Sequence, residues 1–412
     1  MREMKDSGIE WIGQIANTHK LVRLKYIAEI LDEYIKPVTA QYRNQNADIL
    51  YDYYGASGII DKIDGYTIDD HVMLIGEDGA NLKLRNLPLM YEVCGKAWIN
   101  NHAHILKPMK NVDFYYLFYA LESLDINNYI TGSAQPKLNQ ENLKEILIPL
   151  PSYGIQRKVA SYLDTKCSEI DATAEDIQKE ISLLEDYKKS VITEAVTKGL
   201  NPDAEMKDSG IEWVGKVPVT WKIMPNKYIM TKKKVIKEVY DDENIISLSM
   251  NGVIVRDLEA GGKMPKTFDG YQIVYPGNLL MCLFDYDVTP RCIGLIKDYG
   301  VTSPAYSQFV MNNDNYSGYY YYYYLMIDHA KTLLHLAKNL RHSFTEEQLG
   351  AILAPVPTVE EQYQIVNYLD TKCSEIDTLI ADKKRQLDTL ADYKKSLIYE
   401  YVTGKKEVPV NE

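Results

Sequence analysis

Two histidines one residue apart, His102 and His104, form the first pair in the chain that could bind a metal ion. Their alternation is typical of a β-strand, and no cysteine or carboxylate follows at the spacing of zinc ligands. The chain has five cysteines and no CxxC pair, which argues against a zinc knuckle and a disulfide framework. We therefore expect no metal site and reduced thiols at the five positions, Cys94, Cys167, Cys282, Cys292 and Cys373.

A run of six tyrosines at residues 319–324 offers aromatic faces that could stack on exposed nucleic-acid bases. With an offset of 206 residues, however, Phe114–Tyr119 falls on Tyr320–Leu325, and that counterpart mixes phenylalanine and leucine. The mixture is typical of core packing, so we expect both stretches to be buried helices.

Catalytic signatures are absent from the sequence. It contains no GxxxxGK[ST] phosphate loop, no NPPY-like or DPPY-like adenine-methyltransferase motif, no GxSxG elbow and no HExxH. We therefore predict a chain that catalyses no reaction.

Composition describes a globular protein with two or three domains, because 46% of its 412 residues are apolar. The N-terminus does not resemble a signal peptide, and no apolar run is long enough to cross a bilayer, which predicts a cytoplasmic protein. The net charge of −12 argues against a general nucleic-acid binder. Local basic clusters remain, at Lys232–Lys234 with Lys237 and at Lys83 with Arg85.

The strongest signal is an internal repeat. Residues 4–15, MKDSGIEWIGQI, match residues 206–217, MKDSGIEWVGKV, and YLDTKCSEID occurs at both 162–171 and 368–377. The blocks between these repeated segments show no comparable identity. The chain therefore looks like a common frame that holds two different working parts, in a pseudo-two-fold arrangement.

The tail of each copy is predicted to be a long helix. Apolar residues recur at alternating steps of three and four, as in a coiled-coil seam, and Cys167 and Cys373 occupy equivalent seam positions. We expect the two helices to pack antiparallel, with the helix end near Thr403 beside the segment that contains Trp11. Each variable block has β-branched runs interrupted by glycine, which predicts a mainly β module.

These repeated segments resemble the specificity (S) subunit of Type I restriction-modification systems. The resemblance is carried by MKDSGIEWIG and its second copy, YYGASGI, LIGEDGANL, KAWINNHAHIL, LSMNGVIVRD, GVTSPAYS, and IPLP or APVP before YLDTKCSEID. It covers essentially the whole chain. One departure is Ile155-Gln156, where the family usually has Glu-Gln, as at Glu361-Gln362.

The resemblance implies an α+β fold with two mainly β target-recognition domains, separated by two long antiparallel helices. Each domain would read one half of a split DNA sequence. The expected segments are a frame segment at 1–15, the first recognition domain at 16–150, a spacer helix at 151–200, a frame segment at 201–217, the second recognition domain at 218–356, a spacer helix at 357–404 and a tail at 405–412.

The resemblance also implies double-stranded DNA, two modification subunits and restriction subunits as partners. S-adenosylmethionine, ATP and Mg are expected in those partners and no cofactor in this chain. Candidate DNA contacts are Lys83, Arg85, Asn101, His102, Lys107, Lys233, Lys263, Lys266, Arg291, Arg341 and His342. Candidate partner contacts are Trp11, Tyr162, Asp164, Trp213, Tyr368 and Asp370.

A rival hypothesis is a non-catalytic scaffold whose two modules bind proteins. The acidic balance and the 34 tyrosines favour it, because tyrosine is enriched at protein interfaces.

Overall fold

The computed structural model describes residues 3–10, 12–39, 49–132, 135–259, 265–337 and 342–409. The chain divides into two compact units. Unit 1 comprises Met1–Ile177 and Arg385–Glu412, and unit 2 comprises Gln178–Lys384. Each unit contains one β-rich module and part of each of two long helices, so we describe the units separately.

The two long helices are α5 (Tyr153–Lys198) and α8 (Val359–Val402). In unit 1, Tyr162 packs on Tyr401 with ring centroids 4.7 Å apart, and Lys394 contacts Asp171 at 2.6 Å. The two helices therefore run in opposite directions in unit 1.

The same order holds inside unit 2. Lys383 contacts Glu180 at 2.5 Å, and Lys188 contacts Asp377 at 2.6 Å. The helices are thus antiparallel within each unit, as the repeat predicted.

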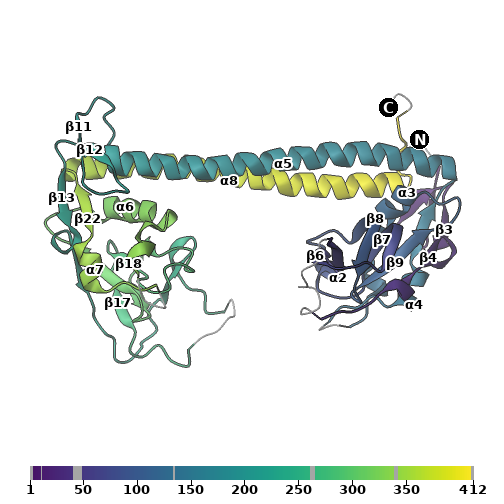
Figure 1. Ribbon diagram of the computed structural model, residues 1–412, viewed down its shortest axis with the longest axis horizontal. Coiled ribbons are helices and arrows are strands. Elements are labelled where there is room, and N and C mark those ends of the chain that lie inside the picture. The colour runs from purple at the N-terminus through teal and green to yellow at the C-terminus, as the bar shows by residue number, and fades with distance from the viewer. Residues whose placement is uncertain are drawn as a thin grey trace. The chain divides into compact units, whose positions relative to one another are not determined.

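Unit 1 is built on one six-stranded sheet with the order β4-β9-β7-β8-β5-β6, of which all strands but β5 are labelled in Figure 1. Its strands are β4 (Ala28–Ile30), β5 (Tyr51–Gly55), β6 (Gly58–Ile63), β7 (Ile68–Gly76), β8 (Met90–Ile99) and β9 (Ala103–Pro108). The frame strands are β1 (Met4–Asp6), β2 (Gln14–Ala16), β3 (Lys20–Arg23) and β10 (Leu147–Leu150). The short helices are α2 (Asn81–Leu84), α3 (Phe114–Ser123), α4 (Gln140–Glu145), η1 (Leu24–Tyr26), η2 (Asp32–Tyr34) and η3 (Asn127–Tyr129).

Unit 2 has a four-stranded sheet with the order β14-β21-β18-β19 and separate strand pairs. Its strands are β11 (Met206–Asp208), β12 (Lys216–Pro218), β13 (Lys222–Pro225), β14 (Met230–Lys233), β15 (Ile246–Ser249), β16 (Gly252–Val255), β17 (Gln272–Val274), β18 (Leu279–Met281), β19 (Ile293–Leu295), β20 (Gly300–Thr302), β21 (Ser307–Met311) and β22 (Leu353–Val356). Its short helices are α6 (Ser317–His329), α7 (Glu346–Ala351), η4 (Asn226–Tyr228) and η5 (Thr332–Leu336).

The frame strands repeat their pairing in the two units. β1 pairs antiparallel with β2 and β11 with β12, while β3 pairs with β10 and β13 with β22. The predicted fold class is therefore confirmed: two mainly β modules of different topology are attached to the same repeated frame.

The aromatic helices α3 and α6 align at an offset of 203 residues. The hydroxyl of Tyr116 lies 2.5 Å from the carbonyl oxygen of Pro149 and 3.1 Å from that of Val402, and the hydroxyl of Tyr319 donates to the carbonyl oxygen of Val196 at 2.8 Å. Val196 and Val402 are equivalent residues of the repeat. The predicted alignment of Phe114–Tyr119 with Tyr320–Leu325 is therefore wrong by three residues, because α6 has 13 residues and α3 has 10, so the two helices begin at different points of the repeat.

The tyrosine run serves packing, as the mixed composition of its counterpart predicted. Tyr319, Tyr320 and Tyr323 are fully buried in the core of unit 2, and Tyr322 and Tyr324 are nearly so. These rings are therefore inaccessible to nucleic-acid bases.

The end of α8 lies beside the first frame segment in unit 1. The backbone N–H of Ala16 donates to the carbonyl oxygen of Thr403 at 3.0 Å, and the hydroxyl of Tyr399 donates to that of Ile12 at 2.7 Å. This confirms the expected position of Thr403, although Trp11 itself lies outside the described residues.

Leu163 and Leu369, equivalent seam residues with no exposed surface, should each matter for stability. Replacing either by alanine removes a buried side chain and leaves a cavity, which should lower the free energy of unfolding by about 2–5 kcal/mol. Leu183 on α5 is 68% exposed, so Leu183→Ala should change it by less than about 0.5 kcal/mol. Urea unfolding followed by circular dichroism measures all three; equal effects would show that the seam is not the core.

Candidate nucleic-acid interface

One edge of the unit 1 sheet gathers polar residues from loops that are distant in sequence. The backbone N–H of Glu77, after β7, donates to the carbonyl oxygen of His102 in the β8–β9 turn at 2.8 Å. The imidazole Nδ1 of His102 lies 2.8 Å from a carboxylate oxygen of Asp78. Asn101, at the tip of this turn, is exposed.

Two lysines join this edge, Lys83 from α2 and Lys137 from the chain between η3 and α4. Lys83 donates to the carbonyl oxygen of Gly132 at 3.4 Å, and Lys137 contacts Glu77 at 2.9 Å. The structure thus brings together the candidates Lys83, Asn101 and His102. It also adds Lys137, which the sequence did not single out because a lone surface lysine carries no signal.

Arg85 and Lys107 lie elsewhere in unit 1. Arg85 donates to the carbonyl oxygens of Leu124 and Glu122, and so ties α2 to the end of α3. Lys107, on β9, pairs with the carboxylate of Asp70, and this hydrogen bond lowers the pKa of that carboxyl. Both cations therefore have hydrogen-bond or ion-pair partners within the module.

His104 faces the interior of unit 1. Its Nδ1 lies 2.7 Å from a carboxylate oxygen of Asp32, and its Nε2 lies 2.8 Å from the carbonyl oxygen of Leu138. Because both neighbours are acceptors, both ring nitrogens carry a proton and the ring is an imidazolium. Burial alone lowers the pKa of His104, but the hydrogen bond and charge of Asp32 outweigh it and raise that pKa.

The candidates in unit 2 are more dispersed. Arg291 donates to the carbonyl oxygens of Ile293 and Met250, both at 3.1 Å, and His342 contacts Asp287 at 2.8 Å. The ammonium of Lys233 lies 3.7 Å from the ring centroid of Tyr275. Lys266 is exposed, whereas Lys263 and Arg341 lie outside the described residues.

The candidate partner-binding carboxylates hold the modules to the long helices. Asp164 accepts a hydrogen bond from the hydroxyl of Tyr119 at 2.8 Å, and Asp370 accepts one from that of Tyr322 at 2.6 Å. Burial, and then these hydrogen bonds, raise the pKa of both tyrosines. These hydrogen bonds within each unit account for an aspartate at both repeated positions, so no contact with a partner subunit is needed to explain it.

The aromatic candidates have mixed surroundings. Tyr368 is exposed, Tyr162 is half-buried, and Trp213 packs half-buried against the unit 2 core. Trp11 lies outside the described residues.

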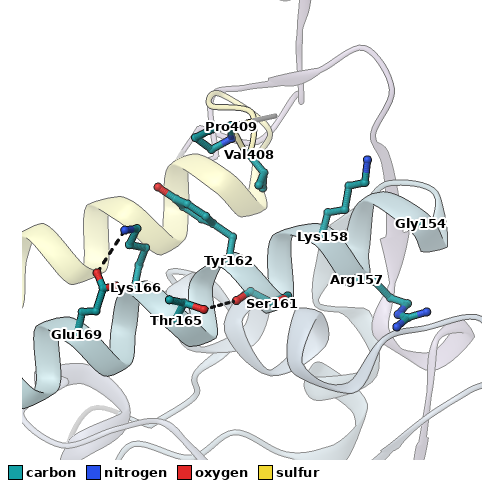
Figure 2. Close-up of a pocket in the computed structure, with 10 residues that line it drawn as sticks. All are labelled: Gly154, Arg157, Lys158, Ser161, Tyr162, Thr165, Lys166, Glu169, Val408 and Pro409. Atoms are coloured by element: carbon teal, nitrogen blue, oxygen red, sulfur yellow. Dashed lines mark hydrogen bonds and ion pairs between the residues drawn. The ribbon is translucent and has the colours of Figure 1, made fainter. Parts of the chain in front are cut away.

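A hollow of about 760 Å³ lies along the first turns of α5 in unit 1 (Figure 2). Arg157, Lys158 and Lys166 project from its helical wall, Tyr162 lies among them, and Val408 and Pro409 form the far side. The repeat places Tyr363, Gln364 and Lys372 at the positions of the three cations. The two like faces of the frame therefore differ in charge.

Two negative findings apply to the described ranges. Within them, no group of three or more histidine, cysteine, aspartate or glutamate side chains is placed to hold a metal ion. The same residues include no helix that is both long and apolar enough to cross a membrane.

Comparisons with known proteins agree with this architecture. Residues 16–183 match the family model described as the Type I restriction modification DNA specificity domain. A putative Type I restriction enzyme MjaX specificity subunit of Methanocaldococcus jannaschii is 25% identical over 405 residues, which cover 94% of this chain and 84% of that protein. Both matches identify the chain as similar to Type I specificity subunits.

Two further similar proteins match over very different shares of their length. A putative Type I specificity subunit of Haemophilus influenzae is 31% identical over 141 residues, so the alignment spans only 35% of that relative. A chain from a solved structure of a Type I R-M system has a TM-score of 0.68 and 12% sequence identity with this chain. That match covers 95% of this chain and 99% of the solved one, and it shows a shared fold.

The buried pair of His104 and Asp32 predicts a pH-dependent stability. The pKa of His104 is raised on folding, so its contribution is fully present below the unfolded value of about 6.5 and is lost as pH rises through the folded value. The pKa of Asp32 is lowered despite burial, mainly by His104, so that contribution is lost only as pH falls through its folded value below 3.8. Wild type should therefore exceed His104→Asn most in free energy of unfolding near pH 5–6.

Denaturant unfolding at pH 5 to 9 checks this, with His102→Asn as the exposed control. A wild-type advantage that stayed constant across that range would contradict the imidazolium assignment.

Proposed function

We propose that this chain is the DNA sequence-recognition subunit of a Type I restriction-modification complex. Each β module reads one half of a bipartite target, and the long helices set the gap between the two halves. One observation carries the proposal: equivalent tyrosines, Tyr116 and Tyr319, attach two modules of unlike topology to equivalent turns of a repeated frame. Like attachment of unlike modules suits the reading of two unlike half-sites. The matched family model, a DNA specificity domain, favours this function over the protein-binding scaffold.

The polar edge of unit 1 supplies suitable chemistry for DNA contact. Asn101 and His102 offer donors and acceptors for base edges, whereas Lys83 and Lys137 suit phosphate oxygens. In unit 2 we assign the corresponding role to Lys233, Lys266 and His342, and we keep Lys263 and Arg341 as candidates.

We assign the catalytic steps to partner subunits. Two modification subunits would bind the two frame regions and supply S-adenosylmethionine, and restriction subunits would supply ATP and Mg chemistry. Partners that provide much of the phosphate-binding surface would also reconcile DNA recognition with a net charge of −12. Tyr162, Tyr368 and Trp213 are the described aromatic candidates for this docking.

The first test of the function is modular replacement. Exchanging residues 16–147 for the same block of a relative should change one half of the methylated sequence and leave the other unchanged. Adenine methylation mapped in cells that also express the modification subunits measures this. The purified single chain, as the control, should transfer no methyl group; a simultaneous change of both half-sites would contradict separate reading.

A second test concerns the gap between the half-sites. Four residues inserted into each helix, after Glu180 and after Asp382, should extend them together because Glu180 pairs with Lys383. At about 1.5 Å per residue the extension is about 6 Å, and duplex DNA advances about 3.4 Å per base pair, so the gap should lengthen by one or two base pairs. Methylation mapping measures the gap.

A two-residue insertion at the same positions is the matched control. Two residues rotate the helical face by about 200°, whereas four nearly restore it, so the shorter insertion should abolish site-specific methylation. An active four-residue variant with an unchanged gap would show that the helices do not set the distance.

A further inference from the structure

A hairpin with the same turn occurs in both units, although their sheets differ. Ala56-Ser57 joins β5 to β6, and Met250-Asn251 joins β15 to β16. In each case a buried glycine with positive φ follows the two-residue tip, Gly58 at +93° and Gly252 at +99°. Ser57, Met250 and Asn251 are exposed. The tip side chains of each hairpin are thus exposed to solvent, whereas the glycine that follows the tip is buried.

The first tip emerges at the polar edge of unit 1. β5 runs parallel to β8, with Tyr54 opposite Ile99, so both strands end at the same edge. The backbone N–H of Asn100 donates to the carbonyl oxygen of Tyr54 at 3.1 Å. A side chain on Gly76 would place Cβ 2.9 Å from the carbonyl oxygen of Ala56, so only glycine allows the tip this close to the end of β7. Ser57 therefore belongs to the edge that carries Asn101 and His102.

The second tip is held by Arg291. Its guanidinium Nη1 donates to the carbonyl oxygen of Met250, and its Nη2 donates to the hydroxyl of Tyr321 at 2.5 Å. Its Nε donates to the carbonyl oxygen of Ile293, which fixes the same side chain to β19. Because each of its three nitrogens donates a hydrogen bond inside the module, Arg291 acts as a positioning residue and differs from the DNA contact expected from sequence.

The hairpin also lies directly on β19. An added Cβ on Gly294 would lie 2.5 Å from a methyl carbon of Val253, so the side chain of Val253 packs directly on the backbone of β19. This support and the Arg291 clamp make the tip a rigid platform.

We propose that the two hairpin tips are reading elements, one for each half-site, with Ser57 and Asn251 in contact with base edges. The inference rests on the proposed function. A two-stranded β-ribbon fits the major groove, which is about 12 Å wide. The side-chain amide of Asn251 matches the donor and acceptor of adenine, whereas the Ser57 hydroxyl is less selective. The second tip is therefore assigned an adenine.

The decisive variant is Asn251→Ala in the full complex with modification subunits. It should relax the preference for adenine at one position of one half-site by roughly ten- to a hundredfold, because one bidentate contact is lost. The other half-site and the gap should not change. Ser57→Ala should produce a smaller relaxation confined to the opposite half-site. Methylation mapping on a library of randomised targets measures both.

Asn244→Ala is the matched control, because Asn244 is an exposed asparagine at the opposite end of the same hairpin. It should methylate like wild type. If Asn251→Ala shows wild-type thermal unfolding but no methylation while Asn244→Ala is active, the result also supports the tip as a DNA contact.

Arg291→Lys separates positioning from direct contact. Lysine keeps the positive charge but cannot donate to Met250, Ile293 and Tyr321 together, so base preference in the second half-site should weaken. The dependence of DNA affinity on salt should not change. A phosphate contact would instead lower the salt slope by about one on substitution to alanine and leave base preference intact.

Two failures are distinguishable. If Asn251→Ala and Ser57→Ala complexes keep wild-type preferences at every position, the hairpin inference is wrong and the proposed function stands. If the wild-type complex methylates without sequence preference, the proposed function itself fails.

Discussion

The attachment of each module to its frame depends on one kind of interaction, a buried tyrosine hydroxyl bonded to the last turns of a long helix. Tyr116 reaches Val402, and Tyr319 reaches Val196. A carbonyl oxygen near a helix C-terminus has no partner within the helix, and leaving it buried and unpaired would cost about 1–3 kcal/mol. The tyrosine meets that need while its ring fills the core beneath, so one side chain fixes both packing and register.

Other contacts extend this junction along the helices. The backbone N–H groups of Asp113 and Tyr316 donate to the buried side chains of Gln156 and Gln362, respectively, at 2.9 Å and 2.7 Å. Every one of these frame acceptors belongs to the repeated helices. The strands beyond α3 and α6 are therefore free to differ in number and order, which is what the two sheets show.

Sequence alone was sufficient for the parts of the fold that repeat. The heptad-like seam, the antiparallel order and the position of Thr403 follow from periodicity and from two identical phrases. The three-residue error in aligning α3 with α6 arose because aromatic letters match at several offsets, whereas the hydrogen-bond acceptors distinguish them, among them Val196 with Val402 and Asp164 with Asp370.

The individual site residues were harder to assign, for a reason of geometry. In the sequence, Arg85 and Arg291 look no different from arginines that bind DNA. In the structure, their guanidinium groups donate to backbone carbonyl oxygens that are distant in sequence. Lys137 shares an edge with Asn101 only because the chain before α4 folds back onto β7. Such proximity depends on tertiary pairing and leaves no local pattern.

The division of the chain between the units has a consequence for its biosynthesis. Unit 2 is one continuous segment, whereas unit 1 is completed by residues from Arg385 onward. Leu397, Ile398 and Tyr401 are buried in the same core as Leu163. A ribosome adds about 5–20 residues per second, so the first module waits on the order of ten seconds or more for its missing helix. During that interval the apolar surface that this helix covers is exposed to solvent. Unit 2, although its synthesis starts later, is therefore the first unit whose whole sequence has been made.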